Sequence, residues 1–209
     1  MYADKPIIGI AGGIGSGKST IARLFGEMGC CVINSDEMVH AAYKDTRVKQ
    51  TLKKWWGNLI FDPNGEVDRA AVWRKVGDRP DDLRRLEQLL HPMVNEARER
   101  LMKAHGEDPK CVAFVWDTPL LFETGLNNHC DAVVFVDTPL EMREQRVRDT
   151  RGWSPEQLAR RENLQMPLDN KRQISDHVVV NTADEDYARG QVREVLSRIL
   201  AGSLPRPVQ

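Results

Sequence analysis

A glycine-rich stretch near the start of the chain, GIAGGIGSGKST at residues 9–20, constrains the fold more than any other part of the sequence. The apolar pair Ile7-Ile8 precedes it and an amphipathic run follows it, so the glycines lie where a strand meets a helix. The stretch contains the spacing G-x-x-x-x-G-K-[ST], which ends at Lys18 and Ser19. Glycines allow the backbone to wrap so tightly that successive N–H groups point at anionic oxygens, and the helix dipole adds to this attraction. The stretch therefore predicts a phosphate-binding loop.

The residue types in this loop indicate how it would hold a nucleoside triphosphate. The predicted phosphate contacts are Gly12, Gly13, Gly15, Ser16, Gly17, Lys18, Ser19 and Thr20. The ammonium group of Lys18 can reach the β- and γ-phosphates, and the hydroxyl of Ser19 can coordinate a Mg²⁺ ion that neutralises the same charges. The alternative is a turn whose glycines only close a helix onto a sheet. A phosphate loop alone leaves a kinase, a GTPase switch and an ATP-driven motor open.

Five short apolar runs indicate the sheet to which the loop belongs. They are residues 7–11, 30–34, 111–116, 132–136 and 177–181. The runs do not alternate with polar residues, which predicts an α/β fold whose parallel sheet is covered on both faces. The chain of 209 residues is long enough for a single domain, 1–209, with a full core and a smaller insert.

The insert is expected between the second and third runs. This gap, about residues 37–110, is much longer than one crossover helix needs, which predicts an inserted helical subdomain. Its apolar spacing predicts one helix from near Glu37 to Trp56, a shorter helix around Val72–Val76 and a long helix from Leu83 to Leu101, distorted at Pro92.

A segment rich in arginine, at about residues 139–165, differs from the rest of the chain. Within it SPEQ predicts the start of a helix, because Ser154 can act as N-cap and Gln157 can complete a capping box. Two short arginine-bearing helices are typical of a lid that neutralises phosphate charge and excludes water. Arg143 and Arg146 are three residues apart and share a helix face, which favours one of them as a phosphate ligand.

Three carboxylates and one histidine are further candidates. Asp36 follows the second apolar run, where it can accept a proton from an attacking hydroxyl or cap the next helix. Asp117 follows the third run, where it can hold Mg²⁺ or form a turn before a proline. Glu123 is either a solvated loop charge or a group that faces the substrate. His91 lies in the long helix of the insert, where a single histidine is more often structural than reactive.

Composition excludes several classes of protein. A net charge of -1 argues against a general binder of nucleic acid or membrane surfaces. The first ten residues fit neither a signal peptide nor a spanning helix, and we expect a cytoplasmic protein.

Four cysteines occur, Cys30, Cys31, Cys111 and Cys130, without any C-x-x-C spacing. Their apolar surroundings favour buried reduced thiols over a metal site or disulfides.

Several motifs in one order make the chain resemble the dephospho-CoA kinase family over residues 7–181. Besides the loop they are VINSDEMVH, FDPNGEVDR, LEQLLHP, DTPLLFE, QMPLDNKR and SDHVVVN. The resemblance implies transfer of the γ-phosphoryl group of ATP to the 3′-hydroxyl of the ribose in dephospho-CoA, the last step of coenzyme A synthesis. It also implies a three-layer P-loop NTPase fold with a five-stranded parallel sheet, a helical insert that binds the acceptor, and a lid.

The resemblance also assigns roles to residues. It implies that Asp36 is the catalytic base, that Arg146 is a lid arginine, and that the insert with His91 falls where the acceptor binds. Together with the loop, this gives three sets of candidate residues. The catalytic set is Asp36, Lys18 and Arg146, and the set that binds the acceptor is Asp36, His91 and Glu123. The metal set is Ser19 and Asp117. The sequence departs from the family pattern at Arg143, Thr150 and Ser175, so no second lid arginine is assigned.

Two other functions stay open at this point. A kinase for a nucleoside or a nucleoside monophosphate would keep the same loop and lid and differ only in the acceptor pocket. A GTP-dependent switch usually carries N-K-x-D, and the nearest match, NKRQ at residues 170–173, lacks the acid that reads guanine. Such a switch would also bind a partner and change shape. For the dephospho-CoA kinase interpretation, the expected partners are the small molecules ATP and dephospho-CoA, with neither nucleic acid nor membrane involved. The oligomeric state is open, with a monomer favoured.

Overall fold

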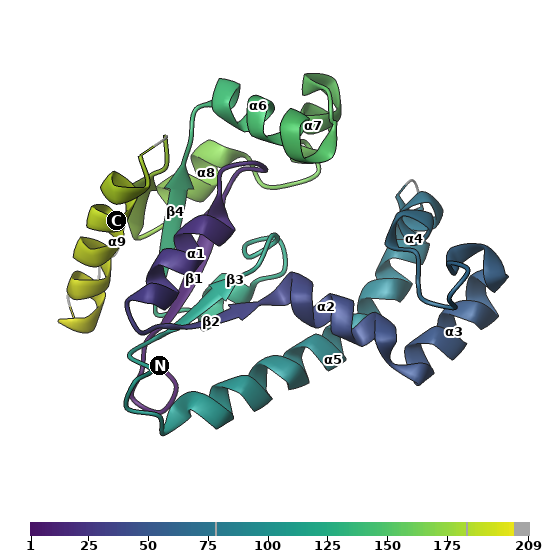
Figure 1. Ribbon diagram of the computed structural model, residues 1–209, viewed down its shortest axis with the longest axis horizontal. Helices are drawn as coiled ribbons and strands as arrows, with labels where there is room; N and C mark the ends of the chain where they lie inside the picture. Colours follow the sequence, from purple (N-terminus) through teal and green to yellow (C-terminus); the bar gives the residue numbers. More distant parts are fainter. Residues whose placement is uncertain (78, 183, 203–209) are drawn as a thin grey trace. The chain divides into compact units, whose positions relative to one another are not determined.

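The computed structural model describes residues 1–77, 79–182 and 184–202 and is drawn in Figure 1. The chain divides into two compact units. One consists of Met1–Asn34 and Met102–Gln209, and the other of Ser35–Leu101. We call them the sheet unit and the helical unit.

The sheet unit contains five parallel strands in the order β2-β3-β1-β4-β5. Their bounds are Ile7–Gly12 for β1, Cys31–Asn34 for β2, Phe114–Asp117 for β3, Ala132–Asp137 for β4 and His177–Val180 for β5. The predicted α/β fold with a five-stranded parallel sheet is confirmed. β3 begins three residues later than expected, because the N–H groups of Cys111 and Val112 bond to carbonyl oxygens outside the sheet.

Strand register brings candidate residues to one edge of the sheet. Ile10 of β1 and Asn34 of β2 both pair with Asp117, the last residue of β3. Gly12, the last residue of β1, pairs with Val136 of β4. The carboxyl ends of parallel strands share one edge. The glycine loop and Asp117 therefore lie at the same edge.

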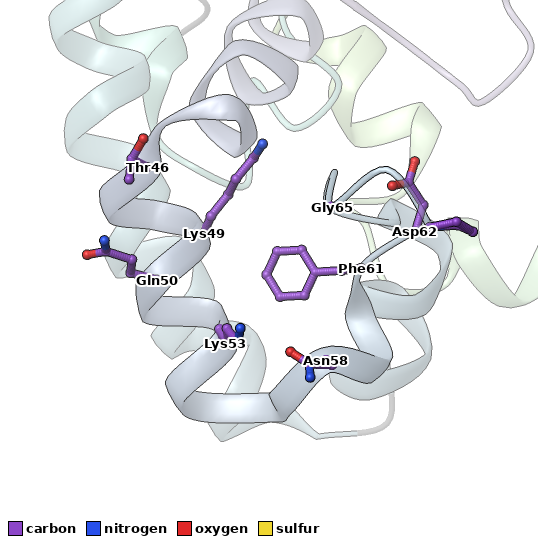
Figure 2. Close-up of a pocket in the computed structure, with 9 residues that line it drawn as sticks. Thr46, Lys49, Gln50, Lys53, Asn58, Phe61, Asp62 and Gly65 are labelled. Carbon is purple, nitrogen blue, oxygen red and sulfur yellow. The ribbon is translucent and has the colours of Figure 1, made fainter.

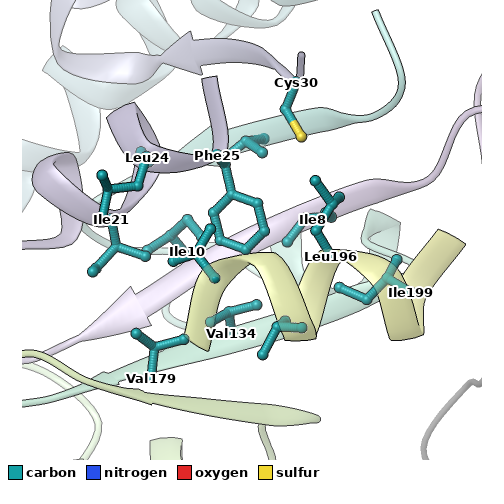
Figure 3. Close-up of a cluster of buried hydrophobic side chains, with 14 of the residues drawn as sticks. Ile8, Ile10, Ile21, Leu24, Phe25, Cys30, Val134, Val179, Leu196 and Ile199 are labelled. Carbon is teal, nitrogen blue, oxygen red and sulfur yellow. The ribbon is translucent and has the colours of Figure 1, made fainter. Parts of the chain in front are cut away.

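Both faces of the sheet are covered. Helices α1 (Lys18–Glu27) and α9 (Glu185–Leu200) contribute to the cluster on one face, which Figure 3 shows. Its members include Ile8, Ile10, Ile21, Leu24, Phe25, Val134, Val179, Leu196 and Ile199. A second cluster contains Phe122 and Phe135, with Leu168 packed against it. Because each buried side chain of this size contributes about 1.5–3 kcal/mol, burial on both faces explains the apolar sequence of the central strands β1, β3 and β4, whereas the edge strands β2 and β5 are partly exposed.

The arginine-rich segment forms α6 (Leu140–Arg151) and α7 (Pro155–Glu162), and α8 (Leu168–Gln173) follows. The predicted capping box of α7 is confirmed. The N–H of Ser154 donates to Oε1 of Gln157 at 2.9 Å, and the N–H of Gln157 donates to Oγ of Ser154 at 3.3 Å. A short 3-10 helix, η2 (Leu126–His129), precedes β4.

The helical unit contains α2 (Ser35–Lys44), α3 (Thr46–Trp56), the 3-10 helix η1 (Gly57–Ile60), α4 (Arg69–Val76) and most of α5 (Pro80–Gly106). The prediction of one helix from near Glu37 to Trp56 is wrong. Asp45 has an extended backbone (φ -64°, ψ 130°), and its carboxylate accepts the N–H of Arg47 at 2.7 Å. Asp45 therefore ends one helix and caps the next. Pro92 lies inside α5.

A hollow of about 400 Å³ lies within the helical unit, between α3 and the segment that follows it. Figure 2 shows the ring of Phe61 in the hollow, with Lys49 and Lys53 of α3 to one side and Asp62 to the other. Lys49 pairs with Glu66 at 2.7 Å. The carboxylate of Asp62 accepts two N–H groups of its own turn. Of the charged groups that line the hollow, Lys49 is therefore paired and the Asp62 carboxylate is held in place by its own turn.

The cysteines differ from the prediction. Cys31 and Cys111 are paired as a disulfide, with Cα atoms 5.6 Å apart, so reduced thiols are the wrong prediction for these two residues. The pairing joins positions 80 residues apart, which no local spacing reveals. Cys30 and Cys130 are free, as expected. Among the described residues, no helix is both long enough and apolar enough to cross a membrane.

Candidate active site

The backbone of the predicted phosphate loop has a positive φ at three glycines, Gly12, Gly15 and Gly17, and the first and last of them illustrate why. Gly12 has φ 148°, and a Cβ atom there would lie 2.8 Å from both Oγ of Ser16 and the carbonyl oxygen of Val136. Gly17 has φ 85°, and a Cβ atom there would lie 2.2 Å from Nδ2 of Asn181. These values of φ disfavour other residues, and the neighbouring atoms leave no room for a side chain. The loop therefore keeps its shape only with glycine at both positions.

The carbonyl oxygens of the loop are turned toward donors. Those of Gly12 and Gly13 accept from Nζ of Lys18 at 3.0 and 2.9 Å. That of Ser16 accepts from Nδ2 of Asn181 at 2.7 Å, from Oγ1 of Thr138 at 3.0 Å and from Arg146 at 3.2 Å. The carbonyl and N–H groups of consecutive peptides point in different directions in such a turn. Holding the carbonyls in this way turns N–H groups of the loop toward an anion, except those of Ile14 and Ser16, which donate to Glu162 and to the carbonyl oxygen of Gly13.

The ammonium group of Lys18 is buried against the loop. Burial lowers its pKa from 10.5 to about 8, and this is the largest effect on the group. The negative charge of Asp117 raises the pKa, whereas Lys171 and Arg151 lower it further. A bound anion stabilises the charged form of such a cation and so raises its pKa again. Lys18 is therefore poised to neutralise a bound phosphate.

The candidate metal ligands differ in exposure. Asp117 is buried at the end of β3, and Ser19 is exposed in the first turn of α1. Within the described part of the chain, no group of three or more histidine, cysteine and acidic side chains could hold a metal ion. The hydroxyl of Ser16 is fully buried, and its oxygen has no hydrogen-bond partner in that same part.

Glu123 pairs with a buried lysine that the sequence did not single out. Nζ of Lys171 lies 2.7 Å from the Glu123 carboxylate and also donates to Gln165 at 3.0 Å. The same carboxylate accepts the N–H of Met166 at 3.0 Å. Burial alone would raise the pKa of Glu123, but the hydrogen bonds outweigh it and the pKa is lowered. Glu123 therefore joins the loop after β3 to the segment between α7 and α8.

The two arginines of α6 occupy different surroundings. Arg146 donates to the carbonyl oxygens of Ser16 and Asn181, each at 3.2 Å. It also borders a hollow of about 220 Å³ that Gly17 and Thr20 help to line. Arg143 is buried and forms an ion pair with Glu162 of α7. Arg146 therefore borders the larger hollow beside the helix end of the loop, whereas the buried Arg143 borders a smaller one of about 130 Å³ beside Gly13.

Asp36 and His91 belong to the helical unit. Asp36 lies in the first turn of α2, two residues after the end of β2, and is exposed. His91 is exposed on α5. All the other candidates belong to the sheet unit, namely the loop residues, Asp117, Glu123 and Arg146.

A comparison with protein-family models identifies the family. The dephospho-CoA kinase model matches residues 6–186, which is most of the chain. The chain belongs to the dephospho-CoA kinase family. The family predicted from the motifs is confirmed.

Individual members of this family match nearly the whole chain. The dephospho-CoA kinase of Rhodopseudomonas palustris strain HaA2 is 38% identical over 96% of this chain and 98% of its own length. That of Nitrobacter winogradskyi is 36% identical with the same coverage. Among solved structures, TT1252 from Thermus thermophilus has a TM-score of 0.78 at 34% identity, over 93% of this chain and 98% of its own. The Campylobacter jejuni dephospho-CoA kinase, with a TM-score of 0.69 at 22% identity over 96% and 100%, shares the fold.

Proposed function

We propose that the protein transfers the γ-phosphoryl group of ATP to the 3′-hydroxyl of the ribose in dephospho-CoA, which gives coenzyme A and ADP. The observation that carries the proposal is the glycine loop with Lys18 buried against it, in a chain that belongs to the dephospho-CoA kinase family along most of its length. We further propose a cytoplasmic enzyme that acts on small molecules as a monomer. Light scattering coupled to size exclusion measures the oligomeric state.

The residues of the chain have separate tasks in this reaction. The loop N–H groups and Lys18 hold the β- and γ-phosphates and neutralise charge that develops during transfer. Arg146, beside the 220 Å³ hollow, borders the space for the nucleoside and adds a positive charge next to the loop. Asp36 accepts the proton of the 3′-hydroxyl as its oxygen attacks phosphorus. Helices α6 and α7 exclude water, which would otherwise compete with that hydroxyl.

Mg²⁺ fits the oxygen donors that the sheet unit offers. Ser19 supplies a hydroxyl in the first turn of α1. Asp117 supplies a buried carboxylate, which is close enough for its negative charge to raise the pKa of Lys18. Two protein ligands are enough, since Mg²⁺ in such sites keeps several waters and is held by the phosphates as well. When bound, the ion neutralises phosphate charge. We propose Ser19 and Asp117 as its ligands.

The acceptor tests the proposal against another small-molecule kinase. With ATP and Mg²⁺ present, we expect kcat/KM for dephospho-CoA to exceed that for adenosine, cytidine or AMP by at least about 100-fold, since groups built to hold the rest of the acceptor stay unpaired with a smaller one. Coupled detection of ADP measures the rates, and mass spectrometry identifies coenzyme A. Equal rates on a nucleoside would overturn the choice of acceptor. A preference for GTP over ATP would instead support the alternative of a GTP-dependent switch.

The lowered pKa of Lys18 predicts how ATP binding depends on pH. Without nucleotide Lys18 loses its proton at about pH 8, whereas bound phosphates keep it charged. Above pH 8, ATP binding must take up a proton, so affinity falls by up to about tenfold for each pH unit. Below pH 8 this group adds no pH dependence. Calorimetry in two buffers with different ionisation enthalpies measures the uptake.

A matched control for this pH prediction is Lys18→Arg. The guanidinium stays charged across the whole range. Proton uptake should therefore disappear in this variant, whatever its affinity. Uptake of the same size in Lys18→Arg would assign the effect to another group.

A further inference from the structure

Ile14, in the middle of the phosphate loop, has both polar groups of its backbone bound by side chains of the lid helices. Its N–H donates to Oε1 of Glu162 at 3.1 Å. Its carbonyl oxygen accepts from Nη1 of Arg143 at 3.4 Å. Arg143 and Glu162 also form an ion pair with each other. Two oppositely charged side chains, one from α6 and one from α7, thus hold a single residue of the loop.

The pair is buried and fixed at its base. The side chain of Arg143 is 7% exposed and that of Glu162 is 19% exposed. Nε of Arg143 also donates to the carbonyl oxygen of Thr138, directly after β4, at 3.2 Å. Removing one member of such a pair leaves the other charge buried without compensation. The pair therefore cannot be an incidental contact between mobile surface groups.

The pair also explains why residue 13 is a glycine. Gly13 does not have a positive φ, so its conformation does not require glycine. A Cβ atom there would lie 2.8 Å from Nη1 of Arg143 and 3.1 Å from Oε1 of Glu162. The missing side chain at position 13 makes room for the charged pair to reach the backbone of the loop.

The loop needs such support because of its composition. Glycines give it the required turns but lose more conformational freedom on ordering than any other residue. A loop that is ordered before its ligand arrives binds more tightly, since the cost of ordering has already been met. Arg146 and Asn181 hold the Ser16 end of the loop. Arg143 and Glu162 hold its centre.

We propose that Arg143 and Glu162 are positioning residues that clamp the Ile14 peptide, keep the phosphate loop in its binding shape without nucleotide, and join that shape to both lid helices. The inference rests on the proposed function, because the ligand of the loop is taken to be ATP. The two charges cancel, so the clamp adds no net repulsion at a site for anions. Neither residue touches the phosphates in this scheme.

The first test uses variants that remove one function of the clamp at a time. Glu162→Leu cannot accept the Ile14 N–H, and it leaves Arg143 uncompensated. We expect it to raise the KM and the Kd for ATP about tenfold, with a smaller change in kcat. Glu162→Gln keeps an acceptor oxygen, so its effect should be about threefold or less. Arg143→Gln leaves the carboxylate facing the loop and should raise the Kd for ATP about tenfold or more.

A double variant keeps the proposal falsifiable if a single variant folds poorly. In Arg143→Gln with Glu162→Gln, the pair is neutral and can still hydrogen-bond to Ile14. ATP affinity should therefore recover to within about threefold of the wild type. Affinity as weak as in Arg143→Gln alone would overturn the proposal.

Hydrogen exchange at the Ile14 amide separates a clamp from general stabilisation. Without nucleotide, this amide should exchange at least tenfold faster in Glu162→Leu than in the wild type, while amides in β1 are unchanged. If the variants lower the melting temperature but leave Ile14 exchange and the Kd for ATP within twofold, the pair only fastens the two helices and the proposal fails. ATP binding is measured without acceptor, so this outcome is distinct from a failure to phosphorylate dephospho-CoA.

Discussion

Asp36→Asn is expected to lower kcat for the phosphorylation of dephospho-CoA by about 10²–10⁴-fold, the usual contribution of a general base. Asparagine has nearly the same shape but cannot accept the proton of the 3′-hydroxyl. The KM for ATP should stay within about twofold, because the proposed role involves the acceptor and not the nucleotide. Steady-state rates with each substrate varied in turn measure both constants. An unchanged kcat would exclude Asp36 as the base.

Glu37→Gln is the matched control for Asp36→Asn. Both acids lie in the first turn of α2, where a negative charge interacts favourably with the helix dipole. The control therefore removes the same charge from the same turn without removing the proposed base. If both variants lose activity equally, Asp36 acts by stabilising the start of α2.

Features that depend on a short stretch of sequence could be predicted. The glycine loop is one, because the positive φ angles of Gly12 and Gly17 are a local requirement that few other residues meet. The capping box at Ser154 and Gln157 is another, since both partners lie within one turn. The central strands β1, β3 and β4 were recognisable because burial on both faces leaves no polar alternation.

The break between α2 and α3 could not be predicted from the spacing of apolar residues. The apolar spacing on both sides of Asp45 suits a single helix, and only the backbone conformation of Asp45 shows that it caps a new one. Aspartate is common both on exposed helix faces and at N-caps. Spacing alone could not separate these roles.

Pairs that are distant in sequence could not be predicted at all. Lys171 with Glu123, and Arg143 with Glu162, are buried ion pairs between different elements. In a sequence, each of these residues is typical of a solvated surface, since isolated charges are rarely buried. The only available signal was that Glu123 and Lys171 each lie in a family motif, DTPLLFE and QMPLDNKR. The fold brings the partners together, and the pairing then makes their burial tolerable.

Lys18→Met is expected to lower kcat/KM for ATP by about 10²–10³-fold or more, because the variant loses the one side-chain cation that bonds directly across the described loop to Gly12 and Gly13. Methionine matches the lysine side chain as far as Cε, so loss of the ammonium group and its charge is the main change. Single-turnover rates with saturating dephospho-CoA separate weaker binding from slower transfer. Activity within about tenfold of the wild type would contradict a role in phosphate binding.

The same substitution should leave the free protein as stable as the wild type, or more so. The unfolded chain keeps the Lys18 proton up to about pH 10.5, whereas the folded chain releases it at about 8. The unfolded state thus binds more protons between these two pH values. The free-energy cost of burying the charged ammonium therefore has its maximum below pH 8 and decreases as the pH rises to 10.5. With a discount for its partial exposure, Lys18→Met should gain about 1–2 kcal/mol at pH 7. Denaturant unfolding at pH 7 and pH 10 checks this: the gain should shrink at the higher pH, and a loss of stability at pH 7 would show that the two carbonyl contacts outweigh the cost of burial.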